Sequence, residues 1–262
     1  MKFVQLFSAL IIFISTSSAN AFDHSHYEFD LLLKKHVTWD EDGGTSTVNY
    51  FGFEQNKGSM EDYLQTIGSV SRSQFESFEK KQQLAFLINA YNAYTIFWVS
   101  QHHRDIKSIK ELGTLFRNPW KSKRFDLFGN VVSLDFIEHQ LIREPGRFDD
   151  PRIHMAVNCA SIGCPALRPE AYEASRINEQ MHDSTLRFLS DTSRNIFKDG
   201  ILFVSPIFKW YEVDFKRKSG SLLNWLRDYE SALKIERESF TSNHLLIKYT
   251  KYDWSLNEST SD

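Results

Sequence analysis

The strongest pattern along the chain is a long apolar stretch at residues 82–100. Leu84 and Leu87 begin a series of apolar side chains spaced three or four positions apart, which is the spacing of one face of an α-helix. Asn89 and Asn92 interrupt the stretch, which is typical of a buried core helix in a soluble protein and not of a membrane span. We expect this helix to be central to the fold.

Shorter patterns on both sides of this helix predict further helices and β-hairpins. The turn pairs Gly129-Asn130 and Asp199-Gly200 each lie between short apolar segments, as in a β-hairpin with a two-residue turn. Helices are predicted at residues 62–67, 73–79, 134–142, 222–229 and 244–249, and a short strand at residues 152–158. The pattern predicts an α+β fold, a single domain in which the central apolar helix packs with short antiparallel hairpins and surrounding helices.

The first 21 residues have the three parts of a cleavable secretory signal peptide. Lys2 supplies the positive charge, residues 6–14 form the apolar run, and Ala19-Asn20-Ala21 offers the small residues that a signal peptidase accepts. This run is too short to cross a bilayer, so cleavage is favoured over the alternative of an uncleaved membrane anchor. We expect a periplasmic or secreted protein with one domain at residues 22–262 and no integral membrane span after cleavage.

The net charge and its distribution along the chain argue against a nucleic-acid partner. The formal net charge is -3, and both signs are interspersed along the chain without a basic cluster. A nucleic-acid partner is therefore not expected, because such proteins carry a concentrated positive surface. We predict no cofactor, and the composition leaves a small-molecule or peptide ligand open.

The densest group of reactive side chains lies between His154 and Cys164. In an exported protein, the close pair Cys159 and Cys164 favours a disulfide. If Cys159 is instead a free thiol, His154 could take its proton and Glu138 could orient the imidazole, as in a thiol-dependent hydrolase or acyltransferase. On a regular strand His154 would share a face with Asn158 and not with Cys159, so that this chemistry needs a turn or bulge.

The two asparagines of the central helix also have two interpretations. Asn89 and Asn92 lie three residues apart on one face, where their amides could stabilise an oxyanion or anchor the cysteine loop. The structural alternative is a pair of amides that bond to buried backbone groups. For either residue alone this second interpretation is favoured.

Two groups of residues have the chemistry of metal ligands. Cys159, Cys164, His154 and Glu138 have the ligand types of zinc, but the chain has no second cysteine pair. Cleavage after Ala21 would place His24 third from a free amine, and this arrangement can wrap one copper(II) ion in square-planar nitrogen geometry. The alternative for His24 is a solvated tail.

Several segments together resemble a bacterial and plant family known as domain of unknown function 547. The matching stretches are residues 84–93, 132–138, 150–165, 207–211 with Asp214 and Phe215, and 252–257. The resemblance marks as motif residues Asn89, Tyr91, Asn92, Glu138, Arg152, His154, Asn158, Cys159, Cys164, Trp210, Tyr211, Asp214, Asp253 and Trp254. It implies candidate residues and no reaction.

Two functions follow as hypotheses. The first is a thiol-dependent hydrolase or acyltransferase with Cys159 and His154 at its centre, for which Glu138, Asn89 and Asn92 are further catalytic candidates. The second is a non-catalytic binding or scaffold module in which a Cys159–Cys164 disulfide staples a loop. Candidate binding residues for either function are Arg152, Asn158, Trp210, Tyr211 and Asp214.

Overall fold

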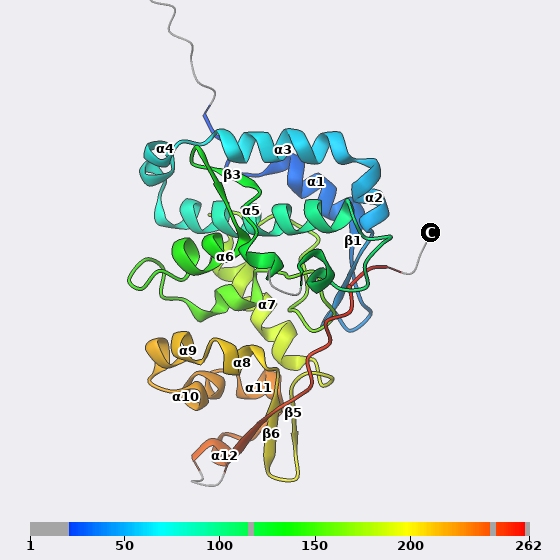
Figure 1. Cartoon of the computed structure of the whole chain (residues 1–262). Coiled ribbons are helices and arrows are strands. Elements are labelled where there is room, and N and C mark those ends of the chain that lie inside the picture. Colours follow the sequence, from blue (N-terminus) through cyan, green and yellow to red (C-terminus); the bar gives the residue numbers. More distant parts are fainter. Residues whose placement is uncertain (1–20, 115–117, 242–244, 260–262) are drawn as a thin grey trace, which may run out of the picture.

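The computed structural model describes residues 21–114, 118–241 and 245–259 of the chain (Figure 1). Helix α5, Lys80–Ser100, runs through the molecule and is apolar all round, so it is buried on nearly every side. Its first turn is closed by a capping box between Glu79 and Gln82. The prediction of a central helix is confirmed. The predicted signal peptide falls almost wholly on residues 1–20, outside the described residues.

Four helices of the N-terminal region cover one side of α5, with α3 lying along it in Figure 1. They are α1 (Tyr27–His36), α2 (Tyr50–Gln55), α3 (Lys57–Ser69) and α4 (Arg72–Ser77). Phe29, Phe53 and Phe75 from these helices are buried in one core cluster with Phe86 of α5. The helices predicted at residues 62–67 and 73–79 are confirmed as parts of α3 and α4.

The opposite side of α5 carries shorter elements and α7 (Ile177–Ser190). Ser133 caps α6 (Leu134–Phe136) by accepting the Phe136 amide, and the helix then widens into the π-helix η3 (Ile137–Ile142). The helix predicted at residues 134–142 is therefore present with a changed hydrogen-bond pattern in its second half.

The strand predicted at residues 152–158 is wrong. The segment begins with the 3₁₀ helix η4 (Pro151–Met155). The Asp150 side chain accepts the Arg152 amide at 3.0 Å, and Pro151 has the backbone angle that a first helical position needs. These two local signals outweigh the β-preference of the residues that follow.

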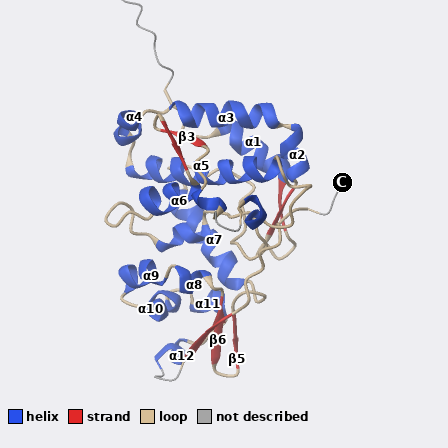
Figure 2. Ribbon diagram, in the orientation of Figure 1, coloured by secondary structure: helices blue, strands red, loops and turns tan. Residues whose placement is uncertain are grey.

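The strands form three small sheets, seen in red in Figure 2. They are the pairs β1 (Val37–Trp39) with β2 (Ser46–Val48) and β3 (Phe125–Leu127) with β4 (Asn130–Val132), and the set β5 (Ile196–Lys198), β6 (Ile201–Val204) and β7 (Leu246–Tyr249). The Asp199-Gly200 turn is as predicted, with both residues at positive φ. In the other hairpin the turn is Phe128-Gly129, one residue earlier than predicted, because Asn130 already pairs with Leu127.

The helix predicted at residues 244–249 is wrong for the part that the structure describes. Residues Leu246–Tyr249 form β7, which pairs in parallel with β6. A short apolar run can form either a helix or a strand. Here the run forms a strand because it pairs with the free edge of β6. With these elements the α+β class is confirmed.

The C-terminal helices pack around a second apolar cluster at the lower end of Figure 1. They are α8 (Ile207–Trp210), α9 (Glu212–Ser219), α10 (Leu222–Arg227), α11 (Glu230–Leu233) and α12 (Arg237–Thr241). The helix predicted at residues 222–229 is confirmed as α10. Helix α7 joins the two clusters, because Met181 belongs to the first and Phe188 to the second.

Residues 245–259, here called the C-terminal strap, cross the molecule from the three-stranded sheet toward β2 (Figure 1, red). After β7 the strap forms one bridge at Leu256 with Ser161 and another at Glu258 with Val48. It therefore ties together segments from the beginning, middle and end of the chain.

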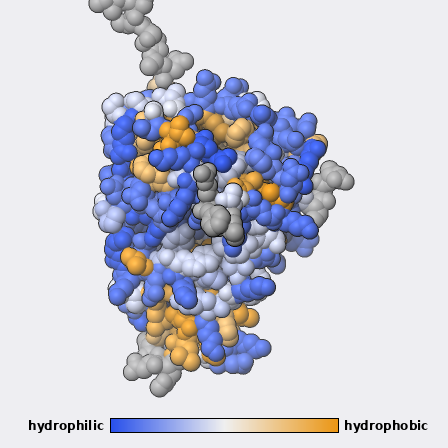
Figure 3. All heavy atoms as spheres, in the orientation of Figure 1, coloured by the Kyte–Doolittle hydropathy of each residue, from blue (hydrophilic) through white to orange (hydrophobic). Residues whose placement is uncertain are grey.

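The surface in Figure 3 is largely polar, with apolar side chains gathered over the lower end where the three-stranded sheet lies. Ile196 and Leu246 are exposed there. No helix in the described part of the chain has the length and apolar character needed to cross a membrane.

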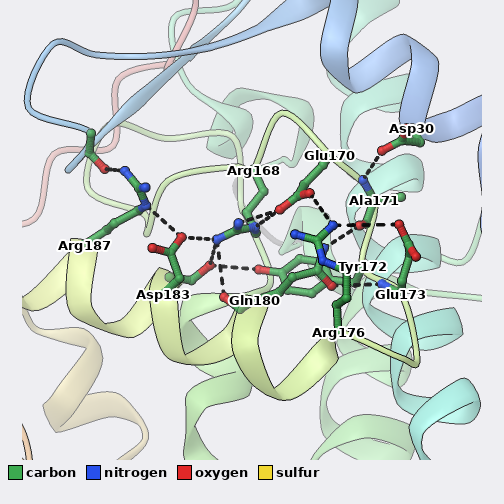
Figure 4. A network of polar contacts seen from close by, with 12 residues as sticks. Asp30, Arg168, Glu170, Ala171, Tyr172, Glu173, Arg176, Gln180, Asp183 and Arg187 are labelled. Carbon is green, nitrogen blue, oxygen red and sulfur yellow. Dashed lines mark hydrogen bonds and ion pairs between the residues drawn. The ribbon is translucent and has the colours of Figure 1, made fainter.

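An ionic network fixes the segment that enters α7 (Figure 4). Arg168 donates to Glu170 and Asp183 and to the hydroxyl of Ser184 at 3.3 Å. Arg168 is 8% exposed, so it is the buried member of the network. Arg176 also binds Glu170, but its side chain is 43% exposed.

We expect Arg168→Leu to lower the free energy of unfolding by about 2–3 kcal/mol, because two carboxylates lose the buried cation that neutralises them. The matched change Arg176→Leu should cost less than about 1 kcal/mol, since exposed ion pairs contribute little. Urea unfolding followed by circular dichroism measures both. Equal losses of unfolding free energy in the two variants would contradict the conclusion that Arg168 is the buried cation on which the network depends.

Candidate functional site

The two cysteines form a disulfide, with Cα atoms 6.2 Å apart. The predicted pairing of Cys159 with Cys164 is confirmed. Neither sulfur is a free thiol in this structure, so Cys159 is not available as a nucleophile and neither cysteine is available as a thiolate ligand for zinc.

The start of the disulfide loop is held by the central helix. Asn92 of α5 donates to the carbonyl of Ala156 at 2.9 Å and accepts the Asn158 amide at 2.9 Å. The Asn158 side chain in turn accepts the Ala160 amide and donates to the carbonyl of Pro165, both at 2.8 Å. The loop is thus closed by a side chain as well as by the disulfide.

The far side of the loop lies against the C-terminal strap. The amides of Ile162 and Gly163 donate to the carbonyls of Ser255 and Asp253 at 2.9 and 2.8 Å. A side chain at Gly163 would meet the Tyr252 ring and the Asp253 carbonyl at 2.9 Å, so only glycine permits this approach. The Tyr252 hydroxyl lies 3.2 Å from both sulfur atoms.

A cavity of about 340 Å³ opens beside the disulfide, at the lower end of the size range of small-molecule sites. Six of the predicted site residues line it, namely Glu138, His154, Cys159, Cys164, Trp210 and Tyr211. Other lining residues are Tyr91, Lys110, Asn118, Trp120, Asp135, His139, Val157, Pro165, Ile207, Tyr252 and Trp254. The cavity is therefore built from segments spread over most of the described chain.

His154 is fixed at the cavity by Asp214. Its Nε2 lies 2.8 Å from Asp214 Oδ2, and the ring stacks on Tyr211 with centroids 3.8 Å apart. Asp214 also accepts hydrogen bonds from Arg143 and Arg217. We expected Glu138 to orient the imidazole, but it forms no hydrogen bond with it in the described structure. The hydrogen bond that holds the ring comes from Asp214 instead.

The protonation of this pair follows from its surroundings. Burial would raise the pKa of Asp214, but hydrogen bonds from His154 and Arg143 outweigh burial and hold it far below its usual range. Burial lowers the pKa of His154, and the hydrogen bond to Asp214 offsets this only partly. An ionised carboxylate only accepts, so Nε2 of a neutral His154 donates to it and Nδ1 is left as an acceptor. This Nδ1 is buried and has no protein partner in the described structure.

Glu138 is the second buried acceptor of the cavity. It lies in the π-helix η3 and is 5% exposed. Hydroxyls of Tyr91 and Tyr211 hydrogen-bond to its carboxylate, and after burial this carboxylate is the main cause of the raised pKa of both tyrosines. Its Oε1 has no hydrogen-bond partner, and among the described residues the carboxylate forms no ion pair.

Aromatic rings form one wall of the cavity. Trp210 stacks on Trp254 with centroids 5.7 Å apart, and Tyr252 lies 4.9 Å from Trp210. Trp120 meets the edge of Trp254 at 5.8 Å, and the Lys110 Nζ lies 3.6 Å from the Trp254 centroid. Trp210 remains 47% exposed, so this wall is open to solvent.

The other predicted site residues lie outside this cavity. Asn89 donates to the Tyr172 carbonyl and accepts the Tyr172 amide, which matches the structural alternative for both helix asparagines. Arg152 is paired with Asp150 and contacts Asn178. Asn89 is therefore bonded to the backbone and Arg152 to a neighbouring carboxylate, and neither side chain points into the cavity.

His24 lies at the N-terminal end of the described chain. Its ring packs against Phe78 with centroids 4.4 Å apart and against Phe22 at 5.2 Å. The copper motif needs a free amine at Phe22 and stays a prediction. Across the described ranges, no group of three or more histidine, cysteine or carboxylate side chains is placed to hold a metal ion.

Residues 75–189 match the model of a family described as Protein of unknown function, DUF547. The match confirms the resemblance to this family for that part of the chain. The DUF547 match includes Glu138, His154 and the disulfide, whereas Trp210, Tyr211, Asp214 and the strap lie beyond it. Neither the curated proteins nor the solved structures include a significant match to the chain.

Several cavity residues were not predicted as site residues. Tyr91 and Trp254 belong to the motif segments, so the sequence did contain a signal for them. Lys110 and Trp120 lie in the 3₁₀ helices η1 (Ile109–Leu112) and η2 (Pro119–Lys121), and no motif marks them.

The contacts of Asn92 predict a structural role. Asn92→Ala should lower the free energy of unfolding by about 2–4 kcal/mol, because it leaves a buried carbonyl and a buried amide unpaired. Asn130→Ala, at the exposed first position of β4, is the control and should change it by less than about 1 kcal/mol. Urea unfolding followed by tryptophan fluorescence measures both, and an unchanged midpoint for Asn92→Ala would contradict this role.

Proposed function

We propose that the chain is an exported binding module whose cavity, beside the Cys159–Cys164 disulfide, holds a small molecule. The cavity supports this proposal, because it combines an open aromatic wall with two buried acceptors that lack partners, Glu138 Oε1 and His154 Nδ1. Buried polar atoms of folded proteins are almost always hydrogen-bonded. Two such atoms at one cavity suggest that a ligand supplies the missing donors.

The disulfide has a structural role in this proposal. It closes the loop that contributes Cys159, Cys164 and Pro165 to the cavity, and the strap with Tyr252 and Trp254 lies against the same loop. Stable disulfides form in oxidising compartments, so the pair also supports export to the periplasm or the extracellular space through the signal peptide.

The six tryptophans of the chain allow a direct test of the binding site. Trp120, Trp210 and Trp254 line the cavity, while Trp39, Trp98 and Trp225 lie elsewhere. We expect a mixture of small polar fragments to shift the indole N–H resonances of the first three and not of the others, measured by NMR on ¹⁵N-labelled protein. Shifts at Trp98 alone would point to a different site, and no shifts would contradict a ligand-binding cavity.

A second candidate function is a thiol-dependent hydrolase or acyltransferase. The observation that favours it is the His154–Asp214 pair, because a neutral imidazole oriented by a carboxylate and lacking a partner at Nδ1 is suited to remove a proton. The chemistry needs a free thiol, so a dithiol would first have to reduce the disulfide and leave as its own disulfide. Cys159 would then lose its proton to His154 and attack a carbonyl carbon, the leaving alcohol or amine would take that proton, and water would hydrolyse the resulting thioester.

Single cysteine variants test this second function without a reductant. Cys164→Ser leaves Cys159 as a lone thiol and should hydrolyse p-nitrophenyl acetate, whereas the matched Cys159→Ser should be inactive. His154→Gln in the Cys164→Ser background should lower the rate by about 100-fold, the contribution of a general base. If both single variants are folded and show the rate of buffer, the hydrolase is excluded and the binding module stands.

A further inference from the structure

We propose that the ligand of this cavity is a small organic ammonium ion, a protonated primary or secondary amine whose charge pairs with Glu138. This inference rests on the proposed binding function and adds the chemical class of the ligand. It follows from the charge of Glu138, the chemistry of its neighbours and the rings that surround it.

Glu138 is a buried carboxylate without a compensating cation in the described structure. Taking such a charge out of water costs several kcal/mol, which two tyrosine hydroxyls offset only in part. Proteins usually resolve this by placing a lysine or arginine beside the carboxylate. Here the nearby Arg143 is instead bound to Asp214 and lies 4.7 Å from the Tyr211 centroid. We infer that a bound ligand supplies the compensating charge.

The free hydrogen-bonding atoms of the cavity specify a donor. Glu138 Oε1 only accepts when ionised, and the bonding of His154 to Asp214 leaves Nδ1 as an acceptor too. An ammonium group with N–H bonds satisfies such acceptors and supplies the missing positive charge. A quaternary ammonium supplies the charge but no hydrogen bond.

The aromatic wall is also suited to a cation. Ring faces carry negative electrostatic potential and attract ammonium groups, most strongly at tryptophan. Lys110 already shows this contact on Trp254, with Nζ 3.6 Å from the ring centroid. Trp210, Tyr211 and Tyr252 offer further rings around the same space.

The other charges that face the cavity do not cancel that of Glu138. Asp135 adds a second carboxylate, whose side chain is 30% exposed, and its neighbour His139 is held by Arg143. Lys110 is the one lysine or arginine among the described lining residues and opposes a cationic ligand. Removing Lys110 should therefore strengthen the binding of a cation, whereas removing Glu138 should weaken it.

Three probes that share one ring separate charge from shape. Cyclohexylammonium, cyclohexanol and cyclohexanecarboxylate are titrated into the folded, disulfide-bonded protein, and the indole resonances of Trp210 and Trp254 are followed by NMR. We expect cyclohexylammonium to bind at least about 10-fold more tightly than cyclohexanol, and the carboxylate to bind most weakly. Tetramethylammonium should bind more weakly than cyclohexylammonium because it has no N–H donor.

Two variants test the role of the charges. Glu138→Gln keeps the side-chain shape and should reduce the preference for cyclohexylammonium over cyclohexanol to less than about 3-fold. Lys110→Met should increase the affinity for cyclohexylammonium relative to that for cyclohexanol by about 3-fold or more. If Glu138→Gln does not fold, the probe series on the unaltered protein and the Lys110→Met variant still decide the question.

The outcomes distinguish this inference from the binding function itself. Equal binding of cyclohexanol and cyclohexylammonium would overturn the ammonium ligand and leave the binding module in place. Tightest binding of cyclohexanecarboxylate would also overturn the ammonium ligand, and it would indicate that Lys110 is the charge that selects the ligand. If neither these probes nor the wider fragment mixture shifts the cavity tryptophans, the binding function fails together with the inference.

Discussion

The structure depends on two amide side chains inside an apolar helix. Asn89 and Asn92 are buried in α5, where no water can satisfy them, and each must bond to another part of the protein. Both bond to backbone amides and carbonyls, at Tyr172 and at residues 156–158. One central helix therefore fixes the path of the chain on both sides of the disulfide loop, and the position of the cavity follows from it.

The cavity lies where the two apolar clusters meet. His154 belongs to the segment held by α5, whereas its partner Asp214 lies 60 residues later on a helix of the second cluster. Arg143 bonds to Asp214 and reaches over Tyr211, so that it links η3 to the same helix. Charges that would be costly to bury alone are paired across this boundary, and Glu138 is the exception. The pairing links the two clusters and leaves the carboxylate of Glu138 without a cation at the cavity.

Local signals predicted five of the twelve α-helices in the described structure, namely α3, α4, α5, α6 and α10, and two of the three hairpins, because caps and turn residues act within a few positions of the chain. Ser133 and the Asp199-Gly200 pair are examples. The error at residues 152–158 was avoidable, since Asp150-Pro151 is a readable helix start. The error at residues 244–249 was not, because the strand exists through its pairing with β6, more than forty positions earlier. For the same reason Asp214 could be identified as a candidate but not as the partner of His154, and the unmarked Lys110 and Trp120 could not be identified at all.

The C-terminal strap has a consequence for the timing of folding. Tyr252 lies 88 positions after Cys164 along the chain, and it packs against a disulfide loop that is synthesised well before it. Contacts between residues so far apart in the chain form late. Much of the core can therefore form while the cavity wall that Tyr252 and Trp254 supply is still missing. A chain truncated before residue 252 would keep most of its core and lack the cavity wall that Tyr252 and Trp254 supply.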